Sequence, residues 1–341
     1  MSAEATISSA VLCGFDQCLV SKGIDPFSLG RCCGISEHVW RDGEEDVALS
    51  DFVRFLERGA TASVEPAFGW SAGRDFDLRV LGALGEAILG APTLGAALTT
   101  FSNYFRLVQN SSELRLDVES DKAVLSYRIL DPDIWPRQQD AEFSLSIFLG
   151  VIQHCLGKDW EPSALTFEHR PSRAVQSWNE TVGTECFFES TANAIVFPAA
   201  ALDRPMPTFD RETWHRHADA LGRALAQRNR ARPTAARVAT AIFAALGRDR
   251  IDQGQIARAL GLSRRTLHRR LDAEGTGFSE IVNSCRLRLA QRQLAERETP
   301  LSQLAVELGY SDQTAFTRAF RQHSGVTPGA YRKTCWPARR S

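Results

Sequence analysis

The C-terminal third of the chain carries one sequence pattern twice, with the second copy about 48 positions after the first. The first copy spans Ile256–Leu271 and the second spans Leu304–Phe320. Each predicts a short helix with apolar residues at helical spacing, a turn at a glycine, a capping residue and a second helix. A chain that repeats this unit must fold its C-terminal part into an all-α domain with two helix-turn-helix units.

Charge divides the chain at nearly the same place. Residues 228–341 hold 21 Lys and Arg against 9 Asp and Glu, a net charge of +12, whereas residues 1–227 hold 19 against 32, a net charge of −13. An excess of arginine in a small domain is typical of a protein that binds a polyanion. Charge and motif together therefore indicate that the C-terminal domain binds double-stranded DNA.

Composition is typical of a globular protein with more than one domain. A chain of 341 residues with 43% hydrophobic side chains can build about two or three domains with buried cores. The longest apolar stretch, Phe143–Ile152, is about half the length needed to cross a bilayer, and the N-terminus lacks the pattern of a signal peptide. We therefore expect a cytoplasmic protein without a membrane partner.

Cysteine and histidine spacing favours no metal or cofactor. The eight cysteines are irregularly spaced and form no paired C-x-x-C unit, so we expect reduced and mostly buried thiols. His215 and His217 stand two apart, which does not place them on one helical face. A redox or metal role remains the alternative for the N-terminal cysteines Cys13, Cys18, Cys32 and Cys33.

The N-terminal half mixes helix and strand signals and is predicted to be an α+β domain. Thr93 is placed to cap a helix, because apolar residues recur at spacings of three and four from Leu94 to Val108. Alternation over Leu114–Val118 and the run Ala123–Leu130 predict a β-hairpin. The other elements expected are a buried helix over Phe143–Cys155 and short strands at 165–168, 186–189 and 194–197.

The boundary between the two halves is predicted at a charged helix. Arg211–Arg228 is typical of such a helix, and Arg230–Pro233 is typical of a break after it. The first 230 residues contain no phosphate-binding glycine loop, no H-E-x-x-H and no G-x-S-x-G, so we expect no enzyme. The predicted domains are an α+β effector-sensing domain over 1–210, a helix and linker over 211–233, and a DNA-binding domain over 234–341.

The second helix of the first unit is the expected recognition helix, capped by Ser263. Leu267 and Leu271 lie one turn apart and must face the core. At about 100° per residue, Arg265 and Arg269 then lie nearly opposite them, where they can read bases. The rest of this face consists of Thr266 and His268 beside these arginines, and of Arg264 and Arg270 at its edges for phosphate contacts.

The second unit opens with Thr299-Pro300, which predicts a capping residue followed by proline at the first helical position. Phe316 and Phe320 fix the buried face of its recognition helix. Arginine can bond both O6 and N7 of guanine, glutamine can do the same for adenine, and a threonine methyl can touch thymine. The residues expected to face outward are Thr314, Thr317, Arg318 and Arg321, with Gln313 near the start of the helix.

A long helix is predicted between the two units, over Phe278–Arg297, with Ile281, Leu287, Ala290 and Leu294 at core spacing. It would hold the two recognition helices rigidly, so that they enter adjacent major-groove segments about 34 Å apart. One chain would thus read two segments of an operator.

Four segments of the C-terminal domain match the signature of a known family. They are LGYSDQTAFTRAF at Leu308–Phe320, GVTPGAYR at Gly325–Arg332, LGLSRRTLHRRL at Leu260–Leu271 and GFSEI at Gly277–Ile281. Together they resemble the DNA-binding domain of AraC-type transcription regulators. The resemblance implies base contacts by Arg265, His268 and Arg269 in the first recognition helix, and by Gln313, Thr314, Thr317 and Arg318 in the second.

The N-terminal half contains APTLGAAL at Ala91–Leu98 and YFRL at Tyr104–Leu107, and it resembles the arabinose-binding type of sensor in that family. This resemblance implies a bacterial regulator that responds to a small molecule of unknown identity. It also implies dimerisation through the N-terminal half and activation of transcription with RNA polymerase as a partner. No motif in residues 1–230 identifies the effector site.

Two other functions remain as alternatives. The same helix-turn-helix pair occurs fused to alkyl-accepting cysteines in DNA-repair methyl-transfer proteins, whose chemistry needs an activated thiolate. Cys32 and Cys33 are adjacent but have no basic partner at a recognisable spacing. The second alternative is a small-molecule enzyme with a helix-turn-helix tail, for which the sequence offers no motif. We therefore interpret the chain as a sequence-specific regulator of transcription.

Overall fold

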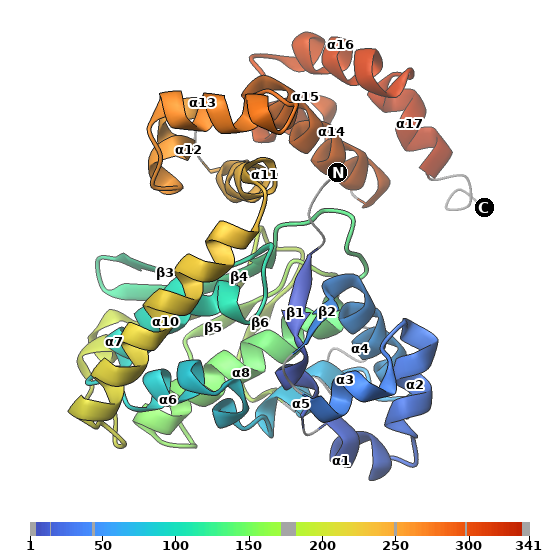
Figure 1. Cartoon of the computed structure of the whole chain (residues 1–341). Coiled ribbons are helices and arrows are strands. Elements are labelled where there is room, and N and C mark those ends of the chain that lie inside the picture. The colour runs from blue at the N-terminus through green and yellow to red at the C-terminus, as the bar shows by residue number, and fades with distance from the viewer. Residues whose placement is uncertain are drawn as a thin grey trace. The chain divides into compact units, whose positions relative to one another are not determined.

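The computed structural model describes residues 5–13, 15–42, 45–171, 182–248, 251–296 and 299–335. They form two compact units (Figure 1). Each unit has its own buried residues. The mixed unit comprises Glu4–Ile129 and Ile134–Arg228, and the helical unit comprises the remainder, mainly Asn229–Ser341. An α+β part followed by an all-α part is the fold class expected from the sequence, and it is confirmed.

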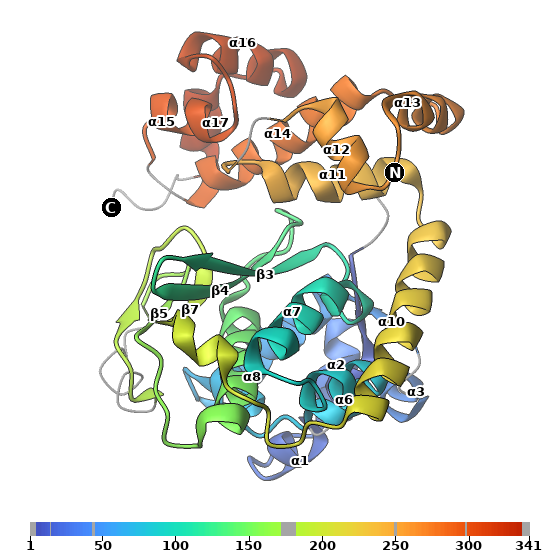
Figure 2. The same ribbon diagram turned by 90° about the vertical axis from the view of Figure 1, so that its left-hand side faces the viewer.

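A five-stranded sheet in the order β3-β4-β7-β5-β6 forms one layer of the mixed unit (Figures 1 and 2). β3 (Ser112–Glu119) and β4 (Lys122–Ile129) pair antiparallel, which confirms the predicted hairpin. β7 (Asn193–Pro198) lies antiparallel to both β4 and β5 (Ala164–Thr166). The last strand is β6 (Cys186–Phe187), parallel to β5, and a separate two-stranded sheet pairs β1 (Thr6–Ser8) with β2 (Asp46–Ala48).

The centre of the mixed unit is α8 (Gln138–Leu156), the buried helix expected from the sequence. It packs against α4 (Leu49–Ser63), α5 (Phe68–Arg74) and strands β4 and β7. α5 approaches it closely because Gly69 has no Cβ, and a Cβ there would lie 2.1 Å from the carbonyl oxygen of Gln139. The other helices of this unit are α1 (Phe15–Val20), α2 (Pro26–Cys33), α3 (Glu37–Asp42), α6 (Ala83–Leu89), α7 (Leu94–Tyr104) and, except for its last turn, α10 (Arg211–Ala231).

Two helix ends in the mixed unit differ from the prediction. The hydroxyl of Thr93 caps α7 as expected, accepting from the amide of Ala96 at 3.2 Å. The helix ends at Tyr104, however, and a 3-10 turn over Phe105–Leu107 leaves Val108 outside it. α10 continues to Ala231, past the predicted break at Arg230, because only the residues next to Pro233 are kept from helical geometry.

The helical unit is organised around α14 (Phe278–Glu296), whose two ends belong to different cores. Its predicted end at Arg297 lies outside the described residues. Ile281, Ala290 and Leu294 are buried as expected, whereas Leu287 is only half-buried. The other helices are α11 (Thr234–Ala245), α12 (Gln253–Ala259), α13 (Arg264–Ala273), α15 (Leu301–Glu307), α16 (Gln313–Ser324) and α17 (Pro328–Cys335).

Each helix-turn-helix unit thus has a core of its own. The first core contains Val238, Ile242, Ile256, Leu267, Leu271, Ile281, Val282 and Cys285. The second contains Ala290, Leu294, Leu304, Ala305, Leu308, Phe316 and Phe320. Because α14 contributes to both, it connects the two recognition helices, as the sequence predicts.

The N-terminal cysteines were the candidates for metal or redox chemistry. Cys33 is buried and Cys18 is half-buried, and burial raises the pKa of both thiols, which opposes thiolate chemistry. Cys13 and Cys32 are exposed. Among the described residues, no group of three or more His, Cys, Asp and Glu side chains is placed to hold a metal ion. Nor does that part of the chain include a helix with the length and apolar character needed to span a bilayer.

Candidate DNA-binding interface

The first helix-turn-helix unit consists of α12 and α13, joined by a tight turn. Gly261 has a φ of +68°, in the left-handed region that glycine adopts without strain. The amide of Leu262 then donates to the carbonyl of Ala257 at 2.9 Å, which folds the chain back across the end of α12. The hydroxyl of Ser263 accepts from the amide of Thr266 at 3.1 Å, so the predicted cap of the recognition helix is confirmed.

α13 buries one side and exposes the other. Leu267 and Leu271 are 0% and 1% exposed and lie in the first core. The predicted recognition face points away from that core, because its side chains alternate with the buried leucines at helical spacing. Its exposed members are Arg264, Arg265, His268, Arg269 and Arg270, and Thr266 is half-buried.

Two members of this face are held by acidic neighbours. A guanidinium nitrogen of Arg264 lies 3.2 Å from Asp252, whose carboxylate also caps α12. His268 Nδ1 lies 2.6 Å from Asp272 Oδ2, one turn along the same helix. Within the described chain, the arginines of this face that form no ion pair are Arg265, Arg269 and Arg270.

The start of α15 differs from the prediction. Pro300 occupies the capping position with extended geometry and makes no side-chain cap, and the helix begins at Leu301. Thr299 therefore does not cap the helix. Its backbone carbonyl instead accepts a hydrogen bond from Arg332 at 2.6 Å. The prediction placed the helix start one residue too early, because proline is accepted both at the cap and in the first turn.

The second recognition helix, α16, starts one residue later than the repeat suggests. Gly309 has a φ of +75°, and the amide of Tyr310 donates to Ala305 at 2.9 Å, as in the first unit. The cap, however, is Asp312, whose Oδ1 accepts from the amide of Ala315 at 2.7 Å. Ser311 occupies the position equivalent to the capping serine of α13 and donates to Asp312 instead. Both residue types are strong caps, so their order alone could not decide between them.

α16 brings the predicted side chains together. Phe316 and Phe320 are buried in the second core, and the opposite side of the helix borders an open surface hollow of about 710 Å³. Gln322 and Thr327 also line this hollow and were missed in the sequence. The spacing of Gln322, four residues after Arg318, was the available signal for one of them. The predicted residues that line the hollow are Gln313, Thr314, Thr317, Arg318 and Arg321.

Two arginines hold the turns of the helix-turn-helix units. Arg237 Nη2 donates to the carbonyl of Leu260 at 3.2 Å, and Arg286 Nη2 donates to the carbonyl of Gly309 at 3.0 Å. The Arg286 guanidinium also lies 4.9 Å from the centre of the Tyr310 ring, a cation–π contact. Part of the positive charge of this unit therefore stabilises the turns, which the net charge alone could not reveal.

Both parts of the chain match models of known protein families. Residues 23–206 match the arabinose-binding domain of AraC transcription regulators, and residues 256–334 match a helix-turn-helix domain. The chain belongs to the AraC family of transcription regulators. This AraC-family regulator therefore joins a sensor domain of the arabinose-binding type to a DNA-binding domain, and the resemblance seen in the sequence is confirmed.

Two named relatives, compared by sequence, agree with this assignment. The regulator is 28% identical to the ornithine utilization regulator of Pseudomonas aeruginosa, over 84% of both chains. It is also 28% identical to the HTH-type transcriptional regulator VirS of Mycobacterium tuberculosis, over 97% of this chain and 98% of that one. The crystal structure of the transcriptional regulator CdpR from Pseudomonas aeruginosa aligns with 78% of this chain and 86% of that one, at 23% identity and a TM-score of 0.39. The families and relatives are regulators rather than enzymes, and none supports the methyl-transfer alternative.

Proposed function

We propose that α13 and α16 enter adjacent major-groove segments of one operator and read its sequence. The observation that carries this proposal is that both helices bury their Leu or Phe residues and turn the predicted side chains outward. The proposed base-reading residues are Arg265, His268 and Arg269 in α13 and Gln313, Thr314, Thr317 and Arg318 in α16. Arg264, Arg270 and Arg321 complete the surface, with Arg264 and Arg270 assigned to phosphates.

The proposal extends to the organisation of the chain. Residues 1–210 sense a small-molecule effector and dimerise, residues 211–233 link, and residues 234–341 bind DNA. The two family matches, over 23–206 and 256–334, support these boundaries. By family resemblance the regulator acts in the cytoplasm as a homodimer and activates transcription through RNA polymerase.

A selection of binding sites from random DNA tests the recognition surface. Arg269→Ala or Arg318→Ala should relax base preference at defined operator positions. Each should lose about 1 to 3 kcal/mol of binding free energy where the arginine makes a bidentate contact with guanine. Arg270→Ala should instead weaken binding to all sequences alike. It should also reduce the steepness of the plot of log affinity against log salt concentration by about one unit. Arg216→Ala, on the exposed side of α10, is the matched control and should change neither property. Wild-type affinity and wild-type base preference in both the Arg269 and Arg318 variants would contradict the proposal.

A further inference from the structure

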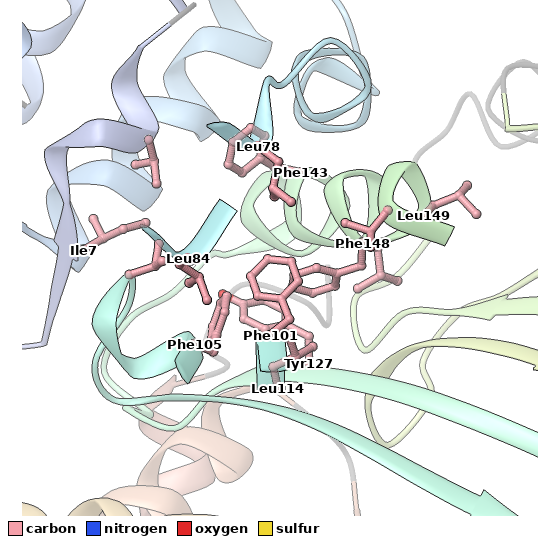
Figure 3. Packing of buried hydrophobic residues seen from close by; sticks show 14 of the residues in the cluster. Ile7, Leu78, Leu84, Phe101, Phe105, Leu114, Tyr127, Phe143, Phe148 and Leu149 are labelled. Atoms are coloured by element: carbon pink, nitrogen blue, oxygen red, sulfur yellow. The ribbon is translucent and has the colours of Figure 1, made fainter. Parts of the chain in front are cut away.

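The mixed unit contains a small cavity walled mainly by apolar side chains, five of which are phenylalanines. It measures about 30 Å³ and is lined from β1, the end of α7 and α8. Phe101, Phe105 and Phe148 pack edge to face, with ring centroids 5.2 to 5.9 Å apart (Figure 3). Phe143 and Ile7 belong to the same wall, and they are buried like these three rings.

One part of this cavity is polar. Gln109 and Ser144 line it and are 2% and 6% exposed. Gln109 Nε2 donates to the hydroxyl of Tyr127 at 2.6 Å, and that hydroxyl donates to Asp140 Oδ2 at 2.7 Å. Asp140 is 1% exposed, and its Oδ1 has no hydrogen-bond partner among the described residues. Because buried polar atoms are nearly always paired, the unpaired oxygen of Asp140, two hydrogen bonds away from Gln109, marks unused hydrogen-bonding capacity in this network.

We infer that this cavity is the effector site of the regulator and that it takes a small, uncharged aromatic molecule with one hydroxyl group. The inference rests on the proposed effector-sensing role of the N-terminal half. Sites for small molecules are mostly apolar, with a few polar groups that fix orientation, and aromatic rings pack well edge to face. Phe101, Phe105 and Phe148 supply the first property, and Gln109 and Ser144 supply the second.

The same lining argues against two other classes of ligand. None of the side chains that line the cavity in the described structure carries a charge, so an amino acid such as ornithine would lose its hydration without gaining a counter-ion. A sugar such as arabinose carries more hydroxyl groups than Gln109 and Ser144 can satisfy, and each unsatisfied group opposes binding. This cavity therefore suits neither arabinose, after which the matching family domain is named, nor ornithine, which appears in the name of one relative.

The size of the cavity explains how a ligand would act. The cavity of about 30 Å³ is much smaller than the roughly 150 Å³ of an apolar cavity that binds benzene, so a ring can enter only if the cavity enlarges. Phe76, Leu81 and Ile147 are the half-buried members of the lining, and they can move with the least loss of burial. A ligand that binds only the enlarged cavity stabilises a second conformation of the mixed unit. An effector must have such unequal affinity for two conformations, because otherwise it cannot shift the balance between them.

Titration calorimetry of the full chain with benzyl alcohol and phenol tests the site. We expect saturable binding with a Kd of about 1 mM or below, and none for L-arabinose or L-ornithine in the same range. Ser144→Ala should weaken benzyl alcohol binding about fivefold by removing one hydrogen bond. Ser146→Ala is the matched control, because Ser146 is also buried on α8 but does not line the cavity. Ile147→Trp replaces a half-buried member of the lining with a larger side chain that fills the cavity, so it should abolish binding of both probes.

Binding to DNA gives the second measurement, with the operator obtained from the site selection. A bound probe should change the operator affinity of the full chain at least about threefold, and Ile147→Trp should remove this response. The proposal is overturned if neither probe binds with a Kd of about 1 mM or below, if binding survives both Ser144→Ala and Ile147→Trp, or if a bound probe leaves the operator affinity unchanged. Binding of arabinose or ornithine that Ile147→Trp blocks would also overturn it. Failure to bind DNA without any probe would instead contradict the proposed recognition surface.

Discussion

Asp140 is an ionisable residue placed where ionisation is costly. Its carboxyl group is buried beside Tyr127, and burial raises its pKa from 3.8 to about 7 despite the hydrogen bond from Tyr127 and the nearby charge of Arg137. Between about pH 4 and pH 7 the folded chain therefore holds a proton that the unfolded chain has released. It follows that this group lowers the free energy of unfolding as pH rises through that window.

Asp140→Asn should remove this dependence, because asparagine has a similar shape and does not ionise. We expect the variant and the wild type to have similar stability near pH 4, and the variant to be more stable above pH 7 by up to about 4 kcal/mol. Urea unfolding of the full chain at several values of pH, followed by tryptophan fluorescence, measures the difference. Asp159→Asn, at an exposed position of the same unit, is the control and should keep the wild-type slope. Parallel profiles for Asp140→Asn and wild type would show that Asp140 is charged in the folded chain at pH 6.

At the level of elements, the contact between α5 and α8 depends on a missing side chain. Gly69→Ala would place a Cβ 2.1 Å from the carbonyl oxygen of Gln139, so the two helices must separate. We expect a loss of about 2 kcal/mol or more in urea unfolding, as is usual for overpacked cores. Gly150→Ala, on α8 with nothing within 4 Å of the new Cβ, should instead stabilise the chain by about 0.5 to 1 kcal/mol. Equal stabilities for the two variants would mean that α5 moves away from α8 without cost.

The sequence predicted those elements whose signals are local. Ser263 caps α13, Thr93 caps α7, and alternation located the β3–β4 hairpin, because each depends on neighbouring residues only. The cap of α16 was harder to place, since Ser311 and Asp312 are both suitable and only the folded chain selects one. The pairing of Arg264 with Asp252 and the close approach of α5 to α8 depend on residues far apart in the chain, so no local pattern could reveal them.

The cavity that we propose as the effector site could not be predicted from the sequence, for the same reason. Its lining comes from segments as far apart as Ile7 and Phe148, and each phenylalanine taken alone is typical of an ordinary core position. The proposed DNA-binding surface follows from sequence patterns alone because each of its two parts lies on one helix. A site built from several elements appears only when the fold brings those elements together.

For the whole molecule, the proposed dimer makes a prediction about fragments. Each unit has its own buried core, so residues 1–230 and residues 231–341 should fold separately. We expect the first fragment and the full chain to sediment as dimers at micromolar concentration, and the second fragment to sediment as a monomer. A monomeric N-terminal fragment would remove dimerisation through this half from the proposal.

The opposite charges of the two halves lead to a prediction about DNA affinity. Residues 1–227 carry a net charge of −13 and residues 228–341 a net charge of +12. Because the two halves are parts of one chain, they meet at about millimolar effective concentration. The acidic half should therefore compete with DNA for the basic surface. Residues 231–341 alone should then bind nonspecific DNA roughly tenfold more tightly at low salt than the effector-free full chain, compared per DNA-binding domain.

Salt separates this competition from the alternative, in which the acidic residues only keep the N-terminal half soluble and away from phosphates. Competition between exposed charges weakens as ionic strength rises, because the Debye length falls from about 30 Å at 0.01 M to about 8 Å at 0.15 M. The difference in affinity between the fragment and the full chain should therefore shrink steadily across this range, measured by fluorescence anisotropy on one labelled duplex. If the two affinities are equal at every salt concentration, the acidic half has no electrostatic part in controlling DNA binding.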